Sequence, residues 1–180
     1  MEFSLIIWLL PIVFMLHDFE EIVMMGAWIK RNNRLIIQRF PKIGKRIVAN
    51  YENLSTASFS LAVAEEFLIV VAATILATQF QWYLLWTACF MAFSIHLIVH
   101  IVQWLVIRIY IPAIISSFLA LIYSFFGFKY LIGSNIYSNS EIVWIGIGGL
   151  LLMIINLIFV HKMAAHFEEF LLKFEKGRLS

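Results

Sequence analysis

Residues 55–107 read STASFSLAVAEEFLIVVAATILATQFQWYLLWTACFMAFSIHLIVHIVQWLVI, a long apolar stretch with a short polar break at Gln79 and Gln81. The stretch is more than twice as long as the roughly 20 residues that a helix needs to cross a bilayer. The break is too short for anything but a tight turn, and Trp82, Tyr83 and Trp86 beside it are typical of the aromatic belt at a membrane surface. The sequence therefore predicts a hairpin of two transmembrane helices, at 55–80 and 81–107.

The composition of the whole chain agrees with this prediction. Of the 180 residues, 63% are hydrophobic and only 13% are charged, whereas soluble domains carry about 25% charged residues. Further apolar stretches at 3–29, 111–132 and 142–163 predict three more spans. The tail at 164–180 mixes aromatic and charged side chains, as in an amphipathic helix on the inner membrane surface. We therefore expect an all-α, polytopic transmembrane bundle of five spans and this tail helix, with residues 1–180 forming a single integral membrane domain.

The positions of Lys and Arg predict the orientation. Basic residues favour the cytoplasmic side of a membrane, and with the first connection in the cytoplasm the N-terminus lies outside and the C-terminus inside. We expect the plasma membrane of a prokaryote. The net charge of +2 fits this topology better than nucleic-acid binding, and the single cysteine, Cys89, excludes an intramolecular disulfide framework. The basic residues of the first connection are Lys30, Arg31, Arg34, Arg39, Lys42, Lys45 and Arg46.

Ionisable side chains occur deep within three of the predicted spans. Each charged group at mid-membrane costs roughly 2.5–3.5 kcal/mol on insertion scales, so the expected reason for them is a functional site inside the bundle. At about 100° per residue, side chains spaced i, i+3 and i+4 share one helix face. Counted from the cytoplasmic ends of the spans, all of them lie about 10–18 Å inward, at one level. They are His17, Glu20, Glu21, Glu65, Glu66, His96 and His100.

These seven residues have the chemistry of metal ligands. Carboxylates and imidazoles without thiolates suit zinc, iron, manganese or cobalt. Four ionised glutamates without basic partners would be neutralised by two divalent ions, or by one ion if some of them are protonated. We therefore expect one or two divalent transition-metal ions, with zinc or iron favoured. Asp18 is expected to accept a hydrogen bond from a histidine ligand, Gln103 shares the stripe of His96 and His100, and Glu21 or Glu66 would be the general base.

Structural interpretations of the same residues remain open. The polar group on the first span could fix the register of packed helices without binding a metal. In the Glu65-Glu66 pair, only one side chain needs to face the bundle interior. His96 and His100 could be core histidines that hydrogen-bond to Glu65 or to backbone carbonyls, although their i, i+4 spacing at the depth of the acids favours ligands.

The order of these residues resembles the HXXEE family of small integral membrane proteins. His17-Asp18-Phe19-Glu20-Glu21 matches the motif that names the family, and Glu65-Glu66 matches an acidic residue in its second span. His96 and His100 precede a turn, Tyr110-Ile111-Pro112-Ala113, that is similar to the family's Tyr-x-Pro-Gly, with alanine in place of glycine. The resemblance covers nearly the whole chain. It implies a shared polar site in a family of unassigned function that is suspected to be metal-dependent.

Two classes of function follow from such a site. The first is a membrane-embedded metal-dependent enzyme that acts on a lipid or another hydrophobic substrate, by hydrolysis with zinc or by oxidation with two irons. The second is a transporter or channel for metal ions or protons. The polar residues form one layer, and the outer halves of the first and third spans are apolar, which favours the enzyme. A non-catalytic membrane partner protein is a third alternative. The expected partners are the lipid bilayer and a hydrophobic substrate, and an oligomer is compatible with the sequence.

Overall fold

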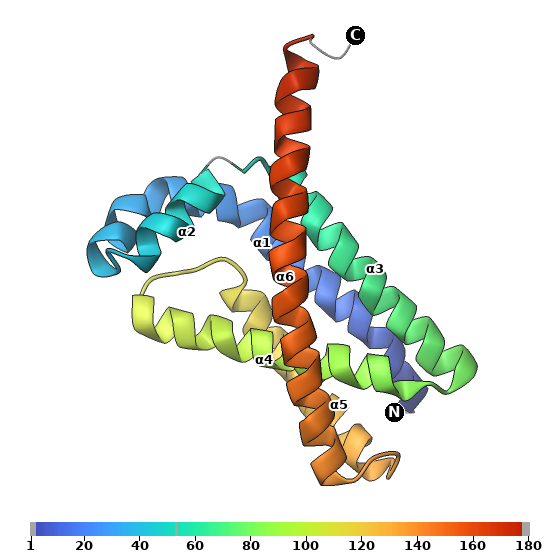
Figure 1. The fold of residues 1–180 in the computed structure, drawn as a ribbon. Helices are drawn as coiled ribbons and strands as arrows, with labels where there is room; N and C mark the ends of the chain where they lie inside the picture. Colours follow the sequence, from blue (N-terminus) through green and yellow to red (C-terminus); the bar gives the residue numbers. More distant parts are fainter. Residues whose placement is uncertain (1–2, 53, 178–180) are drawn as a thin grey trace.

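The computed structural model describes residues 3–52 and 54–177, and within these residues it contains helices and no strand (Figure 1). All helices except α2 are long and apolar enough to cross a membrane. The prediction of an all-α bundle with five spans is therefore confirmed, and the chain is an integral membrane protein. The helices are α1 (Phe3–Arg39), α2 (Ile43–Glu52), α3 (Thr56–Phe80), α4 (Tyr83–Ile107), α5 (Ile114–Gly133) and α6 (Asn139–Glu175).

The predicted α3–α4 hairpin forms as expected. The two helices are separated by Gln81 and Trp82, and Gln81 has a φ of 55°, so the chain reverses through a left-handed residue whose N–H is bonded to the Leu76 carbonyl. Ser55 caps the start of α3 by accepting a hydrogen bond from the backbone N–H of Ser58. Both boundaries of α3 are therefore fixed by local chain chemistry.

The first and last helices are longer than the apolar stretches that predicted them. Each has 37 residues, or about 55 Å, which exceeds the roughly 30 Å of a bilayer core. Most of the basic first connection is helical, because α1 continues to Arg39 and ends before Pro41. The tail is helical as predicted, but it continues α6 without a break and projects beyond the other helices (Figure 1). No glycine or proline interrupts the sequence between Gly149 and Gly177, so nothing ends the helix at the predicted boundary.

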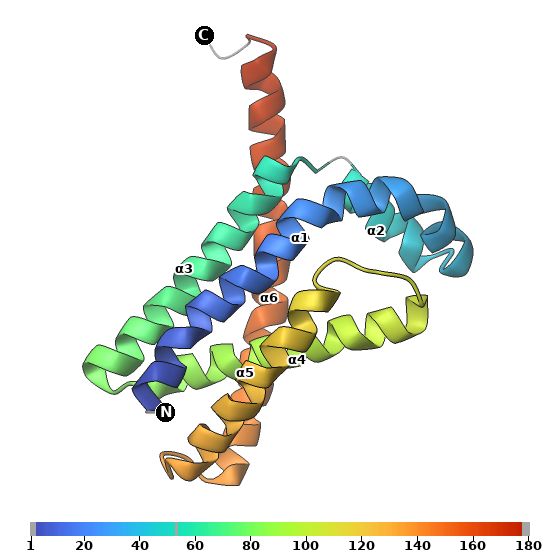
Figure 2. The same cartoon turned by 180° about the vertical axis from the view of Figure 1, so that it is seen from behind.

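Helix α4 is the centre of the bundle. It packs against α3, α5 and α6 and touches α1, while α1 also packs against α2, α3 and α5. Views from opposite sides place α1 and α5 on one face of α4 and α6 on the other (Figures 1 and 2). Helix α6 comes close because Gly149 has no side chain: a Cβ there would lie 2.5 Å from the Ala88 carbonyl oxygen of α4. The fully buried core of the bundle includes Ile6, Leu10, Trp86, Phe90, Leu97 and Leu131.

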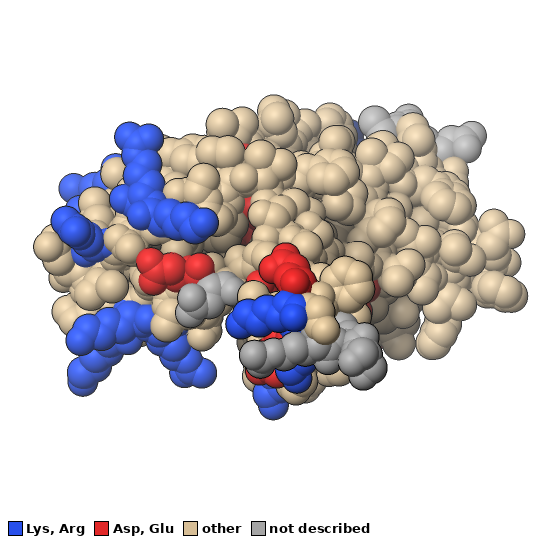
Figure 3. All heavy atoms as spheres, turned by 90° about the horizontal axis from the view of Figure 1, so that it is seen from above, with Lys and Arg blue, Asp and Glu red and all other residues tan. Residues whose placement is uncertain are grey.

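Basic side chains gather at one end of the bundle. Seen along α6 from its C-terminal end, Lys and Arg form one group on the side where α1 and α2 meet and another near the end of α6, with acidic side chains between the two (Figure 3). Helix α2 packs tightly on α1 here, because a Cβ at Gly44 would lie 2.5 Å from the Ile36 carbonyl oxygen. We refer to residues 30–52 as the basic hairpin.

A proline in α1 leaves a backbone carbonyl without its helical donor. Pro11 has no N–H, so the carbonyl of Ile7, four residues earlier, lacks the usual intrahelical bond. The indole Nε1 of the fully buried Trp86 donates to this carbonyl at 3.2 Å, and the Tyr123 hydroxyl donates to the neighbouring Ile6 carbonyl at 3.0 Å. Side chains of α4 and α5 thus supply the donors that a bilayer cannot.

The Trp86 bond gives a prediction for stability. Trp86→Phe should lower the free energy of unfolding in detergent, with about 1–3 kcal/mol of the loss coming from the unpaired Ile7 carbonyl. Pro11→Ala restores a backbone N–H at position 11, so that carbonyl regains a donor within α1. The cost of Trp86→Phe should therefore be smaller in the Pro11→Ala background, as measured by equilibrium unfolding of the four proteins. Equal costs in both backgrounds would contradict this role of Trp86.

Candidate metal centre

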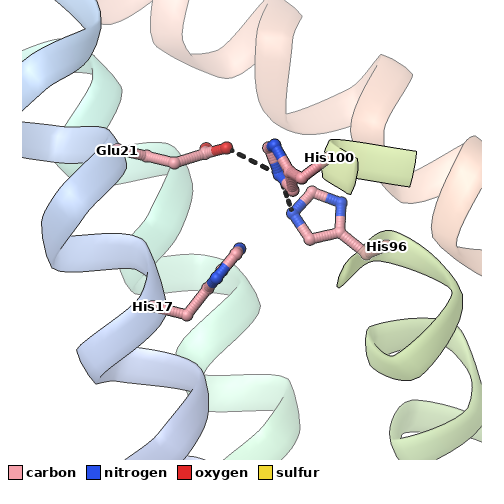
Figure 4. Close-up of side chains that lie close together, drawn as sticks. All are labelled: His17, Glu21, His96 and His100. Atoms are coloured by element: carbon pink, nitrogen blue, oxygen red, sulfur yellow. Dashed lines mark hydrogen bonds and ion pairs between the residues drawn. The ribbon is translucent and has the colours of Figure 1, made fainter. Parts of the chain in front are cut away.

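Three histidines and one glutamate converge between α1 and α4 (Figure 4). His17 and Glu21 lie one turn apart on α1, and His96 and His100 lie one turn apart on α4. The i, i+4 spacing places each pair on one face of its helix. Each of the four residues offers one ligand atom, and these atoms all lie within 4.8 Å of one another. We call this group the His/Glu cluster.

The contacts of His100 are compatible with a set of metal ligands. Its Nε2 lies 3.0 Å from Glu21 Oε1 and 2.9 Å from His96 Nε2. A neutral imidazole nitrogen carries either one proton or one lone pair. One proton on His100 Nε2 cannot serve both neighbours well, and a lone pair there would face the lone pairs of the carboxylate. A cation among the three atoms would instead accept a lone pair from each of them.

His17 completes the cluster, and its hydrogen bonds favour one tautomer. Its Nδ1 lies 3.2 Å from the hydroxyl of Ser116, which donates its own proton to Glu20 Oε2 at 2.7 Å. Glu20 is the nearest acceptor around the hydroxyl, which favours the tautomer with the proton on His17 Nδ1 and the lone pair on Nε2. The side chain is fully buried, and Nε2 has no hydrogen-bond partner. A buried nitrogen with a free lone pair beside three other ligand atoms fits a bound metal ion.

Glu20 belongs to the same sequence motif, but its carboxylate lies at the N-terminal end of α5. Its Oε2 accepts from the backbone N–H of Ser116 at 2.8 Å as well as from the Ser116 hydroxyl, and its Oε1 accepts from the Tyr110 hydroxyl at 2.8 Å. Ser116 lies in the first turn of α5, whose N-cap residue, Ala113, makes no side-chain cap bond. Glu20 thus caps α5 from α1, and the structure places its carboxylate there rather than in the His/Glu cluster.

The turn before α5 explains the glycine of the Tyr-x-Pro-Gly pattern. Ala113 has a φ of 66°, a left-handed conformation that favours glycine, and it is fully buried. The indole of Trp28 on α1 donates to the Tyr110 carbonyl at 2.5 Å. Partial burial and the hydrogen bond to Glu20 raise the pKa of Tyr110 to about 12, so its hydroxyl stays a donor at neutral pH. The turn therefore keeps its tight form with alanine.

The other residues predicted for the site lie around the His/Glu cluster. Glu65 faces α6, where its Oε2 accepts from Asn156 Nδ2 at 3.0 Å. Glu66 makes no hydrogen bond among the described residues, but it is within electrostatic reach of Glu21. Asp18 is buried, its Oδ2 is unpaired, and within the described chain no hydrogen bond joins it to a histidine, contrary to the expectation from sequence. Gln103, one turn beyond His100 toward the C-terminal end of α4, is exposed and makes no contact with the cluster among the described residues.

Sequence reasoning missed the residues that hold these acids in place. Ser116 and Asn156 are uncharged polar residues within apolar stretches. Their cost of insertion into a membrane is small, so they give no signal of a functional role. A second capping contact was also missed: Glu168 of α6 accepts from the backbone N–H of Ser55 at 2.9 Å and from the Ser58 hydroxyl at 2.6 Å, at the start of α3. The only available signal was the presence of polar residues just after a predicted helix start.

Comparison with known proteins identifies the family. Residues 8–127, from α1 into α5, match the HXXEE family, described as "Protein of unknown function with HXXEE motif". The chain belongs to this family. All four residues of the His/Glu cluster lie within the match, as do Glu20 and Ser116. No curated protein and no solved structure matches the chain.

The capping role of Glu20 is testable. Glu20→Ala should lower the free energy of unfolding by about 2–3 kcal/mol, because it removes the acceptor of three hydrogen bonds at the buried start of α5. Glu169→Ala is the matched control, since Glu169 is an exposed helical glutamate on α6. Thermal unfolding of both variants in the same detergent provides the measurement. Equal stabilities of the two variants would exclude the capping role.

Proposed function

We propose that this protein is a membrane-embedded metal-dependent enzyme that acts on a lipid or another hydrophobic substrate. A single divalent transition-metal ion would be held by His17, Glu21, His96 and His100. The observation that carries the proposal is the convergence of four ligand atoms within 4.8 Å, one of them a buried and unpaired imidazole nitrogen. Three imidazoles and one carboxylate suit zinc or iron.

The positions of the remaining acids favour one ion over two. Glu20 is hydrogen-bonded to the start of α5 and Glu65 to Asn156 of α6, so neither is free to join a second ion. A divalent ion with three neutral histidines and Glu21 leaves one positive charge. Asp18 and Glu66, which lie within electrostatic reach of Glu21, can balance this charge. The site is therefore close to neutral with a single ion.

Glu66 is the best candidate for the general base. Glu21 faces His100 at 3.0 Å and would be occupied by the ion. Glu66 lies on α3, outside the cluster but electrostatically coupled to Glu21, and it makes no hydrogen bond among the described residues. A bound zinc ion would supply an activated water for hydrolysis, and a bound iron would supply oxygen chemistry. In either case Glu66 would accept a proton beside the site.

The location of the His/Glu cluster within membrane-spanning helices favours a hydrophobic substrate. An apolar groove of about 510 Å³ lies between α1 and α3, large enough for part of an acyl chain. Phe19, within the HXXEE motif, lines it together with Leu16 of α1 and Phe67 of α3. The groove includes no residue of the His/Glu cluster, so it would hold an acyl chain beside α1 and not at the proposed metal ion.

The alternative of a transporter or channel has less support. Toward the α3–α4 turn the cluster is closed by aromatic rings: His17 packs on Phe93 at a centroid distance of 5.6 Å, and Phe93 packs on Phe14 at 5.6 Å. Beyond them Trp86 stacks on Phe90 at 5.2 Å. A path for ions would require polar groups that continue to the membrane surface on this side. Among the described residues, the buried polar side chains here offer single hydroxyls and no acidic or basic group: Thr74, Thr87, Ser94 and Ser124. A non-catalytic membrane partner protein remains an alternative in which the cluster is structural.

The proposed orientation places the His/Glu cluster nearer the cytoplasm. The basic hairpin and the end of α6 would face the cytoplasm, with the N-terminus outside, in the plasma membrane of a prokaryote. The cluster lies near the middle of α1 and in the C-terminal half of α4, whose last residue, Ile107, accepts a hydrogen bond from Arg39 of the basic hairpin. An ion or a water molecule would then reach it from the cytoplasmic side.

Metal content is the first test of the site. Detergent-purified protein without a polyhistidine tag should contain about one zinc or iron ion per chain by elemental mass spectrometry. His17→Ala, Glu21→Ala and His100→Ala should each weaken binding by more than about 100-fold, because each removes a direct ligand. Glu65→Gln is the matched control and should retain the ion. Unchanged metal content in all three ligand variants would refute the site.

A second test separates catalysis from binding. Glu66→Gln should keep its metal ion but lower turnover by about 10²–10⁴-fold, because it removes the proposed base. The assay follows metal-dependent conversion of a lipid extract in proteoliposomes by mass spectrometry, with Glu65→Gln as the control. A bound ion without conversion of any lipid, together with metal flux across the vesicles, would support the transporter instead.

A further inference from the structure

A narrow crevice enters the bundle between α1, α2 and the start of α3. It holds about 10 Å³, which is room for about one water molecule. It lies where α2 leads into α3, at the end of the bundle that carries the basic hairpin. Its lining consists of Ile22, Met25, Gly26, Tyr51, Leu54, Ser55, Thr56 and Phe59.

Gly26 keeps this crevice open. A Cβ at Gly26 would meet no atom within 4 Å, whereas a Cβ at Gly44 or Gly149 would lie 2.5 Å from a backbone oxygen of a neighbouring helix. Those two glycines permit close helix packing, but Gly26 does not. A glycine in a helix interior costs about 1 kcal/mol relative to alanine. At Gly26 the missing side chain gains no packing in return and leaves empty space in the crevice wall.

Two acidic residues of α1, Asp18 and Glu21, lie within two helical turns of the crevice lining, toward the N-terminal end of the helix. Ile22 lies one turn and Gly26 two turns from Asp18 toward the C-terminal end of α1, and Met25 lies one turn from Glu21, so each shares a helix face with an acid. The Oδ2 atom of Asp18 is buried and has no partner. An extension of the crevice along α1 past Ile22 and Met25 would reach these carboxylates.

The opposite wall of the crevice is within electrostatic reach of acidic residues. Tyr51 lines the crevice from α2, and its hydroxyl lies 3.1 Å from His161 Nε2 of α6. Burial, together with the negative charges of Glu21 and Glu66, raises the pKa of Tyr51 to about 12. Both acids therefore lie within electrostatic reach of the crevice wall.

We propose that this crevice is the route by which a divalent metal ion reaches the His/Glu cluster from the aqueous side, with Asp18 and Glu66 as intermediate carboxylates. The inference rests on the proposed metal site and adds the path that loads it. Carboxylates along a path replace the waters of a hydrated cation in steps and lower the barrier to its entrance. Because the crevice has room for only about one water molecule, Met25 or Tyr51 must move when the ion passes.

Filling the crevice tests the route. Gly26→Leu should slow both the uptake of Co²⁺ by metal-free protein and its release to a chelator by about tenfold, equivalent to about 1.4 kcal/mol of added barrier. Stoichiometry and Kd should not change, because a blocked path slows both directions equally. Stopped-flow absorption of the Co²⁺ ligand-field bands measures both rates. Gly148→Leu is the matched control, since Gly148 is also a helical glycine with nothing within 4 Å of its Cβ position.

A cysteine variant tests the same route without a large substitution. Gly26→Cys in a Cys89→Ser background carries the chain's single thiol, and a bulky, membrane-impermeant thiol reagent should slow Co²⁺ exchange after labelling. Wild-type rates in both Gly26→Leu and the labelled protein would overturn the route. If the wild-type protein binds no Co²⁺, zinc or iron, the proposed metal site itself fails, so the two failures are distinguishable.

Discussion

Inside a bilayer no water completes the hydrogen bonds of a polar group, and this constraint determines how α1 is held in the bundle. Apolar packing alone holds helices weakly in lipid, because acyl chains are as apolar as leucine. Helix α1 instead presents polar groups that only other helices can satisfy. The Ile7 carbonyl freed by Pro11 is bonded by Trp86 of α4, and Glu20 is bonded by Ser116 of α5. Polar contacts thus fix the position and rotation of α1, and the His/Glu cluster forms between the contact at Ile7 and the contact of Trp28 with the Tyr110 carbonyl.

The HXXEE motif divides its side chains between two neighbouring helices. His17 and Glu21, four residues apart, face His96 and His100 of α4, whereas Glu20 faces the start of α5. Ser116 joins the two directions, because its hydroxyl donates to Glu20 and, in the favoured tautomer, accepts from His17 Nδ1–H. One hydroxyl group therefore contacts both the capping carboxylate of α5 and the imidazole of His17. In this arrangement Glu20 contributes to the site by orienting a candidate ligand, and its carboxylate is not free to bind a metal itself.

The sequence predicted the spans and the paired ligands because both depend on local periodicity. A run of about 20 apolar residues predicts a span wherever it occurs, and i, i+4 spacing places two side chains on one face regardless of neighbours. Hydropathy does not mark where α1 and α6 end, because their ends depend on breakers such as Pro41 and Gly177 beyond the apolar region. Nor does an arc of about 100° on one helix specify which neighbour each side chain meets. The separate positions of Glu20 and Glu65 depend on how α5 and α6 pack, which periodicity does not encode.

The distribution of unpaired atoms argues that the cluster is more than a structural device. A polar cluster that only fixed helix register would pair its ionisable groups, as Glu20 and Glu65 are paired with α5 and α6. Among the described residues, six buried side-chain atoms have no partner: three are hydroxyls, of Thr74, Thr87 and Ser117, and the three ionisable ones are all in or beside the cluster, namely His17 Nε2, Asp18 Oδ2 and His100 Nδ1. Each unpaired buried atom costs about 1–3 kcal/mol. Helix packing gives no reason to leave several ionisable atoms unpaired at one level of the bundle. A site that binds a cation gives such a reason, because its lone pairs must be free for the cation.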